Sequence, residues 1–329
     1  MFVDVDSESA GARRTMGTCR LPGCTDPTTV ALGGDDGDGR FSIVSDNEGA
    51  VVVAWFDTTT ADLVVVRCTD NFCTGAEPVV ISSDLVSDAF AIAVSANNDL
   101  TVAYVDSNGL QLMRCADPTC TGDQPVALPT GPGTYLNLSM VINEQGNPVL
   151  IAEQWGSGAF DQLFVCTNPD CHDAEPTELV ESGGYDHVIV KMKPDGTPTI
   201  MMLGGQIYVM SCTTPTCSND QPQRVDVGTL LPWTISAVLD ETGHPVIAYT
   251  VDGPNSGELW ILVCKTPTCV GDQPMLVHRG PANSDLYRPS IDTTSAGHTI
   301  ITVFERGPDG LNLLLVECPS TACTADPLP

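Results

Sequence analysis

Apolar and β-branched residues occur along this chain in short runs separated by Gly, Pro, Asn and Asp. The clearest unit begins at residue 233, and Asp240–Gly243 is a turn signal between its first two runs. Its four runs span residues 233–239, 245–249, 259–264 and 274–277. Such runs predict four antiparallel strands joined by tight turns. No segment shows an apolar stripe with a period of about 3.6 residues, so we expect very little helix.

The same order of runs recurs along the whole chain. The second run reappears at residues 51–55, 100–104, 148–152, 198–202 and 299–303. The third run reappears at residues 63–68, 110–115, 162–166, 206–212 and 311–318. Four-stranded units that repeat every ~40–50 residues are typical of β-propeller blades, in which neighbouring blades cover each sheet. The sequence therefore predicts an all-β β-propeller.

We expect one propeller domain over residues 1–329 with seven blades, the first of them incomplete. Its repeats are predicted at approximately 1–32, 33–82, 83–130, 131–181, 182–228, 229–280 and 281–329. The first repeat opens with residues 2–6, which match the second strand of the other units, so it lacks a first strand. The alternative is six blades with the N-terminal unit as an appendage. In either case an unfilled strand position suits the addition of a strand from another chain.

All fourteen cysteines belong to Cys-x4-Cys pairs. The pairs are Cys19/Cys24, Cys68/Cys73, Cys115/Cys120, Cys166/Cys171, Cys212/Cys217, Cys264/Cys269 and Cys318/Cys323. Disulfide-bonded Cα atoms lie about 4.4–6.8 Å apart, so each pair can close only across a turn. A closed zinc site would need four ligands, whereas these pairs lie in different repeats. We therefore predict seven local disulfides, an oxidising compartment, and an extracellular or cell-surface location.

The segment Asp240–Cys264 carries the pattern Asp-x-x-Gly-x-Pro-Val-Ile-Ala-Tyr followed by Leu-x-Leu-type residues and a cysteine. With the other cysteine-bearing repeats, it resembles the repeats of secreted bacterial β-propeller proteins that are stapled by Cys-x4-Cys pairs. The resemblance covers nearly the whole chain. It implies the fold and export, and it does not imply an activity.

The chain is strongly acidic, with 13 lysines and arginines against 42 aspartates and glutamates, a formal net charge of −29. Because nucleic acids and anionic lipids are polyanions, this charge argues against both as partners. No run of about 18 apolar residues predicts a membrane helix. The N-terminal residues Met1–Asp6 lack the pattern of a signal peptide, so we expect that an export signal has been removed or lies upstream.

Motifs for catalysis are missing from the sequence, including His-Glu-x-x-His, Gly-x-Ser-x-Gly and a phosphate-binding glycine loop. The histidines fall at different positions of the repeat, and they are His172, His187, His244, His278 and His298. Asp186 and Asp292 are candidates for a carboxylate pair lining a channel, but no motif connects them. We therefore predict that the protein is not an enzyme.

Asp35, Asp36 and Asp38 form the densest acidic cluster, on a glycine-rich loop. Their oxygens make this loop a weak candidate for binding Ca²⁺. The loop lacks the bidentate Glu of an EF-hand, so a solvated loop is the preferred interpretation. No other cofactor is expected.

Aromatic residues gather near the start of the first strand of the repeats. They are Phe41, Phe90, Tyr135, Tyr185, Trp233 and Tyr287. Their distance from the following turn varies by up to three residues, and an odd shift moves a side chain to the other face of a strand. We therefore interpret them as packing between blades rather than as a carbohydrate-binding ring. The sequon Asn137-Leu-Ser139 falls in a predicted strand, where no glycan is expected.

Two functional hypotheses follow. The favoured one is an exported, non-enzymatic propeller that serves as a structural or protein–protein interaction module, with self-assembly into an extracellular surface structure or filament as one form of it. The alternative is a ligand-binding, glycan-binding or glycan-processing propeller with a site in the central funnel. The sequence predicts a protein partner or self-association, and it leaves any small-molecule ligand unidentified.

Overall fold

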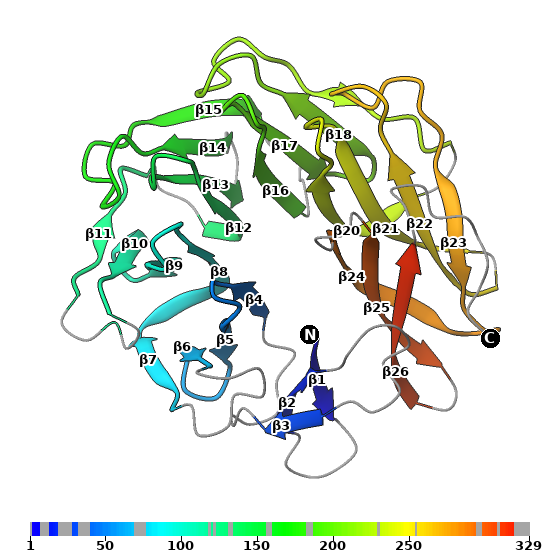
Figure 1. Ribbon diagram of the computed structural model, residues 1–329, viewed down its shortest axis with the longest axis horizontal. Coiled ribbons are helices and arrows are strands. Elements are labelled where there is room, and N and C mark those ends of the chain that lie inside the picture. Colours follow the sequence, from blue (N-terminus) through cyan, green and yellow to red (C-terminus); the bar gives the residue numbers. More distant parts are fainter. Residues whose placement is uncertain are drawn as a thin grey trace. The chain divides into compact units, whose positions relative to one another are not determined.

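The computed structural model of the protein consists of strands, turns and loops (Figure 1). It describes residues 2–6, 13–18, 28–31, 40–68, 77–117, 120, 123–130, 134–155, 160–181, 187–228, 231–253, 255–293, 298–307 and 310–318. The chain packs as two compact units. Unit 1 is Met1–Gly156 with Phe164–Pro176, and unit 2 is Ser157–Leu163 with Thr177–Pro329. The described part of the chain holds no helix with the length and apolarity needed to cross a membrane.

The strands form seven sheets, each built from consecutive strands. The N-terminal sheet contains β1 (Phe2–Asp6), β2 (Arg13–Thr18) and β3 (Thr28–Ala31). The second contains β4 (Phe41–Ser45), β5 (Val51–Asp57), β6 (Asp62–Arg67) and β7 (Val79–Ser82). The third contains β8 (Leu85–Val94), β9 (Leu100–Asp106), β10 (Gly109–Cys115) and β11 (Val126–Ala127). The fourth contains β12 (Thr134–Ile142), β13 (Pro148–Trp155), β14 (Phe160–Val165) and β15 (Pro176–Glu181).

The remaining three sheets follow the same order. The fifth contains β16 (His187–Met192), β17 (Pro198–Leu203), β18 (Ile207–Ser211) and β19 (Gln223–Arg224). The sixth contains β20 (Pro232–Leu239), β21 (Pro245–Asp252), β22 (Gly257–Val263) and β23 (Met275–Arg279). The seventh contains β24 (Asp285–Thr293), β25 (Thr299–Gly307) and β26 (Gly310–Cys318).

The prediction of an all-β β-propeller is confirmed, but the blade number differs from the expected seven. Six sheets open with an antiparallel hairpin, and these hairpins are β4–β5, β8–β9, β12–β13, β16–β17, β20–β21 and β24–β25. The N-terminal sheet has three strands, and among the described residues no strand precedes β1. The propeller therefore has six blades, the stated alternative, because only six repeats supply the opening hairpin. We call the opening strands β4, β8, β12, β16, β20 and β24 the first strands.

Five residues, Asp240–His244, join the first and second strands of the sixth sheet. The amide of Gly243 donates to the carbonyl of Asp240 at 2.9 Å. Asp240 Oδ1 accepts hydrogen bonds from the amides of Thr242 and His244 at 2.8 and 2.9 Å. Gly243 has a φ of +81°, a conformation that favours glycine. Asn143 accepts the same two amide bonds in the β12–β13 turn. Such turns fix the register of the hairpin, and the register decides which side chains are buried.

The charge of Asp240 should stabilise this turn in a pH-dependent way. Burial alone would raise the pKa of Asp240, but the hydrogen bonds from Thr242 and His244 outweigh burial and hold the pKa below its usual value. A carboxyl group with a depressed folded pKa contributes stability that is present above its unfolded pKa of about 3.9. That stability is lost as the pH falls through the lower folded value.

We expect Asp240→Ala to lower the free energy of unfolding by about 1–2 kcal/mol at neutral pH, because two backbone amides lose their acceptor. Asp240→Asn keeps the acceptor, as Asn143 does in its own turn, so it should cost less and flatten the acid dependence. Urea unfolding at a series of pH values measures both effects. Equal losses for the two variants, or an unchanged acid dependence in Asp240→Asn, would contradict this account.

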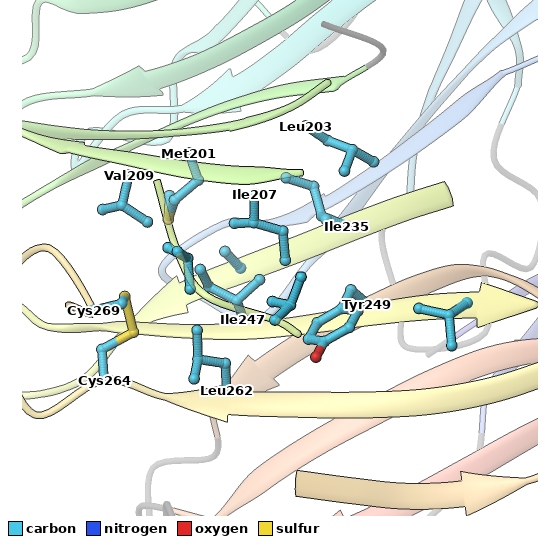
Figure 2. Close-up of a cluster of buried hydrophobic side chains, with 14 residues drawn as sticks. Met201, Leu203, Ile207, Val209, Ile235, Ile247, Tyr249, Leu262, Cys264 and Cys269 are labelled. Atoms are coloured by element: carbon cyan, nitrogen blue, oxygen red, sulfur yellow. A yellow bond between two sulfur atoms is a disulfide. The ribbon is translucent and has the colours of Figure 1, made fainter. Parts of the chain in front are cut away.

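The second strand of the sixth sheet is covered on both faces. In β21, Ile247 and Tyr249 pack with side chains of the β16–β19 sheet, whereas Ala248 packs with side chains of the β24–β26 sheet. Figure 2 shows the first of these clusters, with the Cys264–Cys269 disulfide at one end of it and Tyr249 toward the other. Burial on both faces explains why the strand is a continuous apolar run rather than an alternating one.

Four of the predicted cysteine pairs are disulfides in the structure. They are Cys115–Cys120, Cys166–Cys171, Cys212–Cys217 and Cys264–Cys269, with Cα atoms 4.5, 4.8, 4.9 and 4.7 Å apart. Cys68 and Cys318 are also disulfide-bonded, and no described cysteine is free. The predicted cysteines Cys19, Cys24, Cys73 and Cys323 lie outside the described residues. The bonds indicate that the protein folds and persists in an oxidising environment.

The same backbone geometry recurs at these disulfides. The second cysteine has a left-handed backbone with φ between +51° and +58° at Cys120, Cys171, Cys217 and Cys269. In three loops an aspartate accepts a hydrogen bond from the amide that follows the first cysteine. The aspartates are Asp123, Asp220 and Asp272, at 3.0, 2.8 and 2.8 Å. This Cys-x4-Cys-x2-Asp pattern was not predicted, although the recurring tripeptide Asp-Gln-Pro at 123–125, 220–222 and 272–274 is its signal.

Candidate functional site at the bulged ends of the first strands

Four of the six first strands are interrupted by register shifts in their N-terminal halves. The shifts lie between Leu85 and Phe90 in β8, Tyr135 and Asn137 in β12, Pro232 and Thr234 in β20, and Tyr287 and Ser290 in β24. A β-bulge leaves a residue out of the ladder and redirects its side chain, and bulges are over-represented next to active sites. These bulged ends are therefore the candidate functional surface in each unit.

In unit 1 the bulged ends bring together Arg40, Asp88, Asn137 and Glu153, which we call the Glu153 cluster. Asn137 pairs with Glu153 in the β12–β13 ladder, and its Nδ2 donates to Glu153 Oε2. Asn137 Oδ1 accepts a hydrogen bond from Arg40 Nη1 at 2.5 Å. Arg40 Nε lies 3.2 Å from Asp88 Oδ2. One polar chain thus connects side chains from three consecutive sheets.

The members of the Glu153 cluster differ in exposure. The side chains of Arg40 and Asp88 are 36% and 45% exposed, whereas Glu153 is 1% exposed. A buried carboxylate costs several kcal/mol unless it is paired and hydrogen-bonded. Asn137 supplies a hydrogen bond to Glu153, and Arg40 places a positive charge behind Asn137. Glu153 is thereby held in the structure, while Arg40 and Asp88 offer a donor and an acceptor to a ligand.

Glu258 and Glu305 are two of the buried carboxylates of unit 2. Glu258 is 5% exposed and accepts hydrogen bonds from Arg279 Nε at 2.8 Å and Trp260 Nε1 at 3.0 Å. Glu305 is 7% exposed, and its Oε2 lies 3.3 Å from His278 Nε2. Arg279 and His278 are neighbours in β23. Both carboxylates are therefore engaged by side chains of the same strand.

The aromatic residues at the first strands fall into two groups. Phe90 and Tyr135 are 6% and 1% exposed and belong to apolar clusters, as packing between blades requires. Trp233 is 61% exposed, so the packing interpretation is wrong for this residue. The physical reason is the bulge, which leaves Trp233 unpaired between Pro232 and Thr234 and turns its ring to solvent.

The structure does not bring the other predicted site residues together. Asp35, Asp36, Asp38 and Asp186 lie outside the described residues. Asp292 is exposed on β24. Asp292 acts electrostatically on Lys191. Burial lowers the pKa of the Lys191 amino group, and the negative charge of Asp292 partly offsets that effect.

The described histidines do not form a shared site either. His278 lies beside Glu305, and His298 Nδ1 lies 3.1 Å from Glu317 Oε1. Across the described ranges, no group of three or more His, Cys, Asp or Glu side chains is arranged to hold a metal ion.

The Glu153 cluster was not predicted, although the repeat carries a signal for it. Glu153 occupies the position that Val105 and Thr250 occupy in other second strands. Because this strand position is uncharged in those repeats, a glutamate there indicates that the side chain does more than pack between sheets. Its partners could not be read from the sequence, because Arg40 and Asn137 are 97 residues apart in the chain.

Comparison with known proteins identifies the fold. No family model and no curated protein matches this chain. Solved structures do match. An ulvan lyase, a polysaccharide lyase bound to GlcA(1-4)Rha3S, is 12% identical with a TM-score of 0.59, over 85% of this chain and 80% of the lyase. A Dyadobacter fermentans protein of unknown function is 12% identical with a TM-score of 0.57, over 84% and 93% of the two chains.

A Bacteroides uniformis protein provisionally named a 6-phosphogluconolactonase gives 15% identity and a TM-score of 0.55, over 94% and 92% of the two chains. At these identities, structural likeness shows a common fold and does not transfer an activity. The chain is therefore similar to these proteins in its fold alone.

Proposed function

We propose that this protein is an exported β-propeller that acts by binding a partner rather than by catalysis. The observation that carries the proposal is the engagement of three buried carboxylates near the bulged ends. Glu153, Glu258 and Glu305 are held by Asn137, Arg279 and His278, respectively. A catalytic acid or base must instead reach a proton of the substrate. The exposed groups of the same regions are suited to contact a ligand.

The proposed location is extracellular or at the cell surface. Four local disulfides support an oxidising compartment. The net charge of −29 supports solubility there and disfavours binding to nucleic acid or anionic lipid.

Polysaccharides are the first ligands to test, because a polysaccharide lyase is among the proteins with this fold. We expect saturable binding of at least one polysaccharide by the full chain, with no release of reducing ends or unsaturated products. Glu153→Gln and Glu258→Gln serve as controls for residual chemistry. Product formation that either variant abolishes would contradict the proposal and favour the alternative, a polysaccharide-processing propeller.

A second candidate function is self-assembly into an extracellular structure. Among the described residues, β26 is the outermost strand of its sheet, whereas the other five blades have a fourth strand at that position. An unpaired strand edge can accept a strand from another chain. Light scattering and electron microscopy of the oxidised protein at high concentration would show growing particles, and a strictly monomeric protein would contradict this second function.

A further inference from the structure

The strands β20, β22 and β24 begin at one end of unit 2. The amide of Gly257, at the start of β22, donates to the carbonyl of Ser284 at 2.6 Å, just before β24. A side chain at Gly257 would collide with the backbone nitrogen of Leu286. Further along, the amide of Ile291 donates to Ser236 Oγ at 3.2 Å and connects β24 to β20. These two hydrogen bonds connect β24 to the neighbouring sheet near β22 and along β20.

Two exposed apolar side chains extend from the start of β20. Trp233 is 61% exposed and Leu231 is 63% exposed. Trp233 sits in the bulge, and the buried residues Pro232 and Ile235 fix the backbone on either side of it. The indole therefore projects from an ordered strand rather than from a loop, which limits the entropy lost when it contacts a ligand.

A cationic and aromatic group lies at the start of β24. Tyr287 stacks on Phe304 of β25, with ring centroids 5.8 Å apart. The guanidinium carbon of Arg306 lies 5.2 Å from the centroid of the Tyr287 ring. Arg306 is exposed at the end of β25. Asp285 is the cross-strand partner of Arg306 in the β24–β25 ladder, but no ion pair forms between Arg306 and a carboxylate of the described residues.

This positive charge is unusual for the molecule. The chain has 42 acidic residues, and several of its arginines are already paired with carboxylates, among them Arg67, Arg114 and Arg279. An exposed guanidinium that is packed on an aromatic ring is well suited to carboxylate or sulfate, which it can bind through two hydrogen bonds. The charge at this end therefore complements an anionic ligand.

The geometry points to an acidic polysaccharide as the ligand of this surface, which we call the Trp233 surface and which comprises Leu231, Trp233, Tyr287 and Arg306. A sugar ring would stack on the indole of Trp233, and a carboxylate or sulfate group of the chain would pair with Arg306. This inference rests on the proposed binding function and names the class of partner.

A protein partner fits this surface less well. Specific protein interfaces bury about 800 Å² on each side around an apolar centre. Among the described residues, the large exposed apolar side chains are Val80, Val86, Leu231, Trp233 and Val270. Only Leu231 and Trp233 belong to this surface. One exposed ring on β20 and one exposed guanidinium on the second strand of the neighbouring sheet match the repeating unit of an acidic glycan better than they match a protein.

The test is calorimetric titration of the oxidised full chain with polygalacturonate, dextran sulfate and uncharged dextran. We expect saturable binding of an anionic polymer and none of dextran. The polymer that binds distinguishes carboxylate from sulfate. Trp233→Ala should weaken binding about tenfold or more, because an aromatic anchor is lost. Trp233→Phe should retain part of the affinity.

Arg306→Gln should weaken binding to a similar degree and reduce its dependence on salt, because the ion pair is screened by salt. Arg224→Gln removes the same charge from exposed strand β19, and Val270→Ala trims an exposed apolar side chain elsewhere in unit 2. Both controls should leave binding unchanged. All variants should keep the wild-type thermal midpoint, since the substituted side chains are exposed.

Either of two titration results would overturn the inference. One is a wild-type protein that binds none of the anionic polymers. The other is unchanged binding in both Trp233→Ala and Arg306→Gln. If the protein instead captures a protein partner and Trp233→Ala abolishes capture, the glycan assignment fails while the binding function stands. Turnover of a polymer would reject the binding function itself.

Discussion

Asn137→Leu is expected to lower the free energy of unfolding by about 3–5 kcal/mol, because it removes a hydrogen-bond partner from a buried carboxylate. Glu153 is 1% exposed and accepts a hydrogen bond from Asn137 Nδ2. Leucine has a similar volume, so the loss should come from the missing hydrogen bond to the buried carboxylate rather than from a cavity. The change also disconnects Arg40 from the Glu153 cluster.

Chemical denaturation at neutral pH measures this loss as a shift in midpoint with an unchanged slope. Thr234→Val is the matched control, because Thr234 and Thr250 occupy the same ladder position in the sixth sheet and their hydroxyls lie 2.7 Å apart. That variant loses a neutral hydrogen bond and should cost about 1 kcal/mol. The double variant Asn137→Leu with Glu153→Leu should recover much of the loss. If Asn137→Leu lowers the free energy of unfolding no more than the control does, the hydrogen bond from Asn137 is not needed to stabilise the buried charge of Glu153.

Removal of the Cys212–Cys217 disulfide is expected to cost about 2–4 kcal/mol. Constraint of the unfolded chain contributes roughly 2 kcal/mol for so short a loop in the chain-entropy model. The cysteines are 0% and 3% exposed, so their substitution by alanine also removes buried volume.

The double variant Cys212→Ala with Cys217→Ala should show this loss in urea unfolding without reductant. Asp220→Asn is a matched control in the same loop, since it keeps the disulfide and an acceptor for the amide of Thr213. In reductant, the wild type should lose more free energy of unfolding than the double variant does, because all of its disulfides are reduced. An unchanged midpoint in the double variant would mean that the loop is held by its hydrogen bonds alone.

Much of the fold can be predicted from the sequence because its determinants are local. Runs such as 245–249 alternate with turn residues such as Asp240–Gly243, and each Cys-x4-Cys pair can close only across a turn. The blade number was harder to predict, because the N-terminal unit contains strand-like runs without an opening hairpin. Counting cysteine pairs therefore gives one unit more than counting hairpins.

The candidate site could not be predicted in the same way. A bulge adds one residue to a strand and reverses the face of its neighbours, so Trp233 reads as a core aromatic in a period-two pattern although it is exposed. The contact between Arg40 and Asn137 joins residues from different repeats. Such contacts depend on how the sheets pack, and the sequence of one repeat does not indicate which side chains of the next repeat it will contact.

The spacing of the cysteines also bears on how the protein acquires its covalent structure. Eight free cysteines can pair in about 105 ways, and the number grows steeply beyond that. Here the partners of each described bond are separated by five residues, so a cysteine meets its correct partner far more often than any other thiol. Oxidation should therefore reach the native pairing directly, with little need for an isomerase to correct scrambled intermediates.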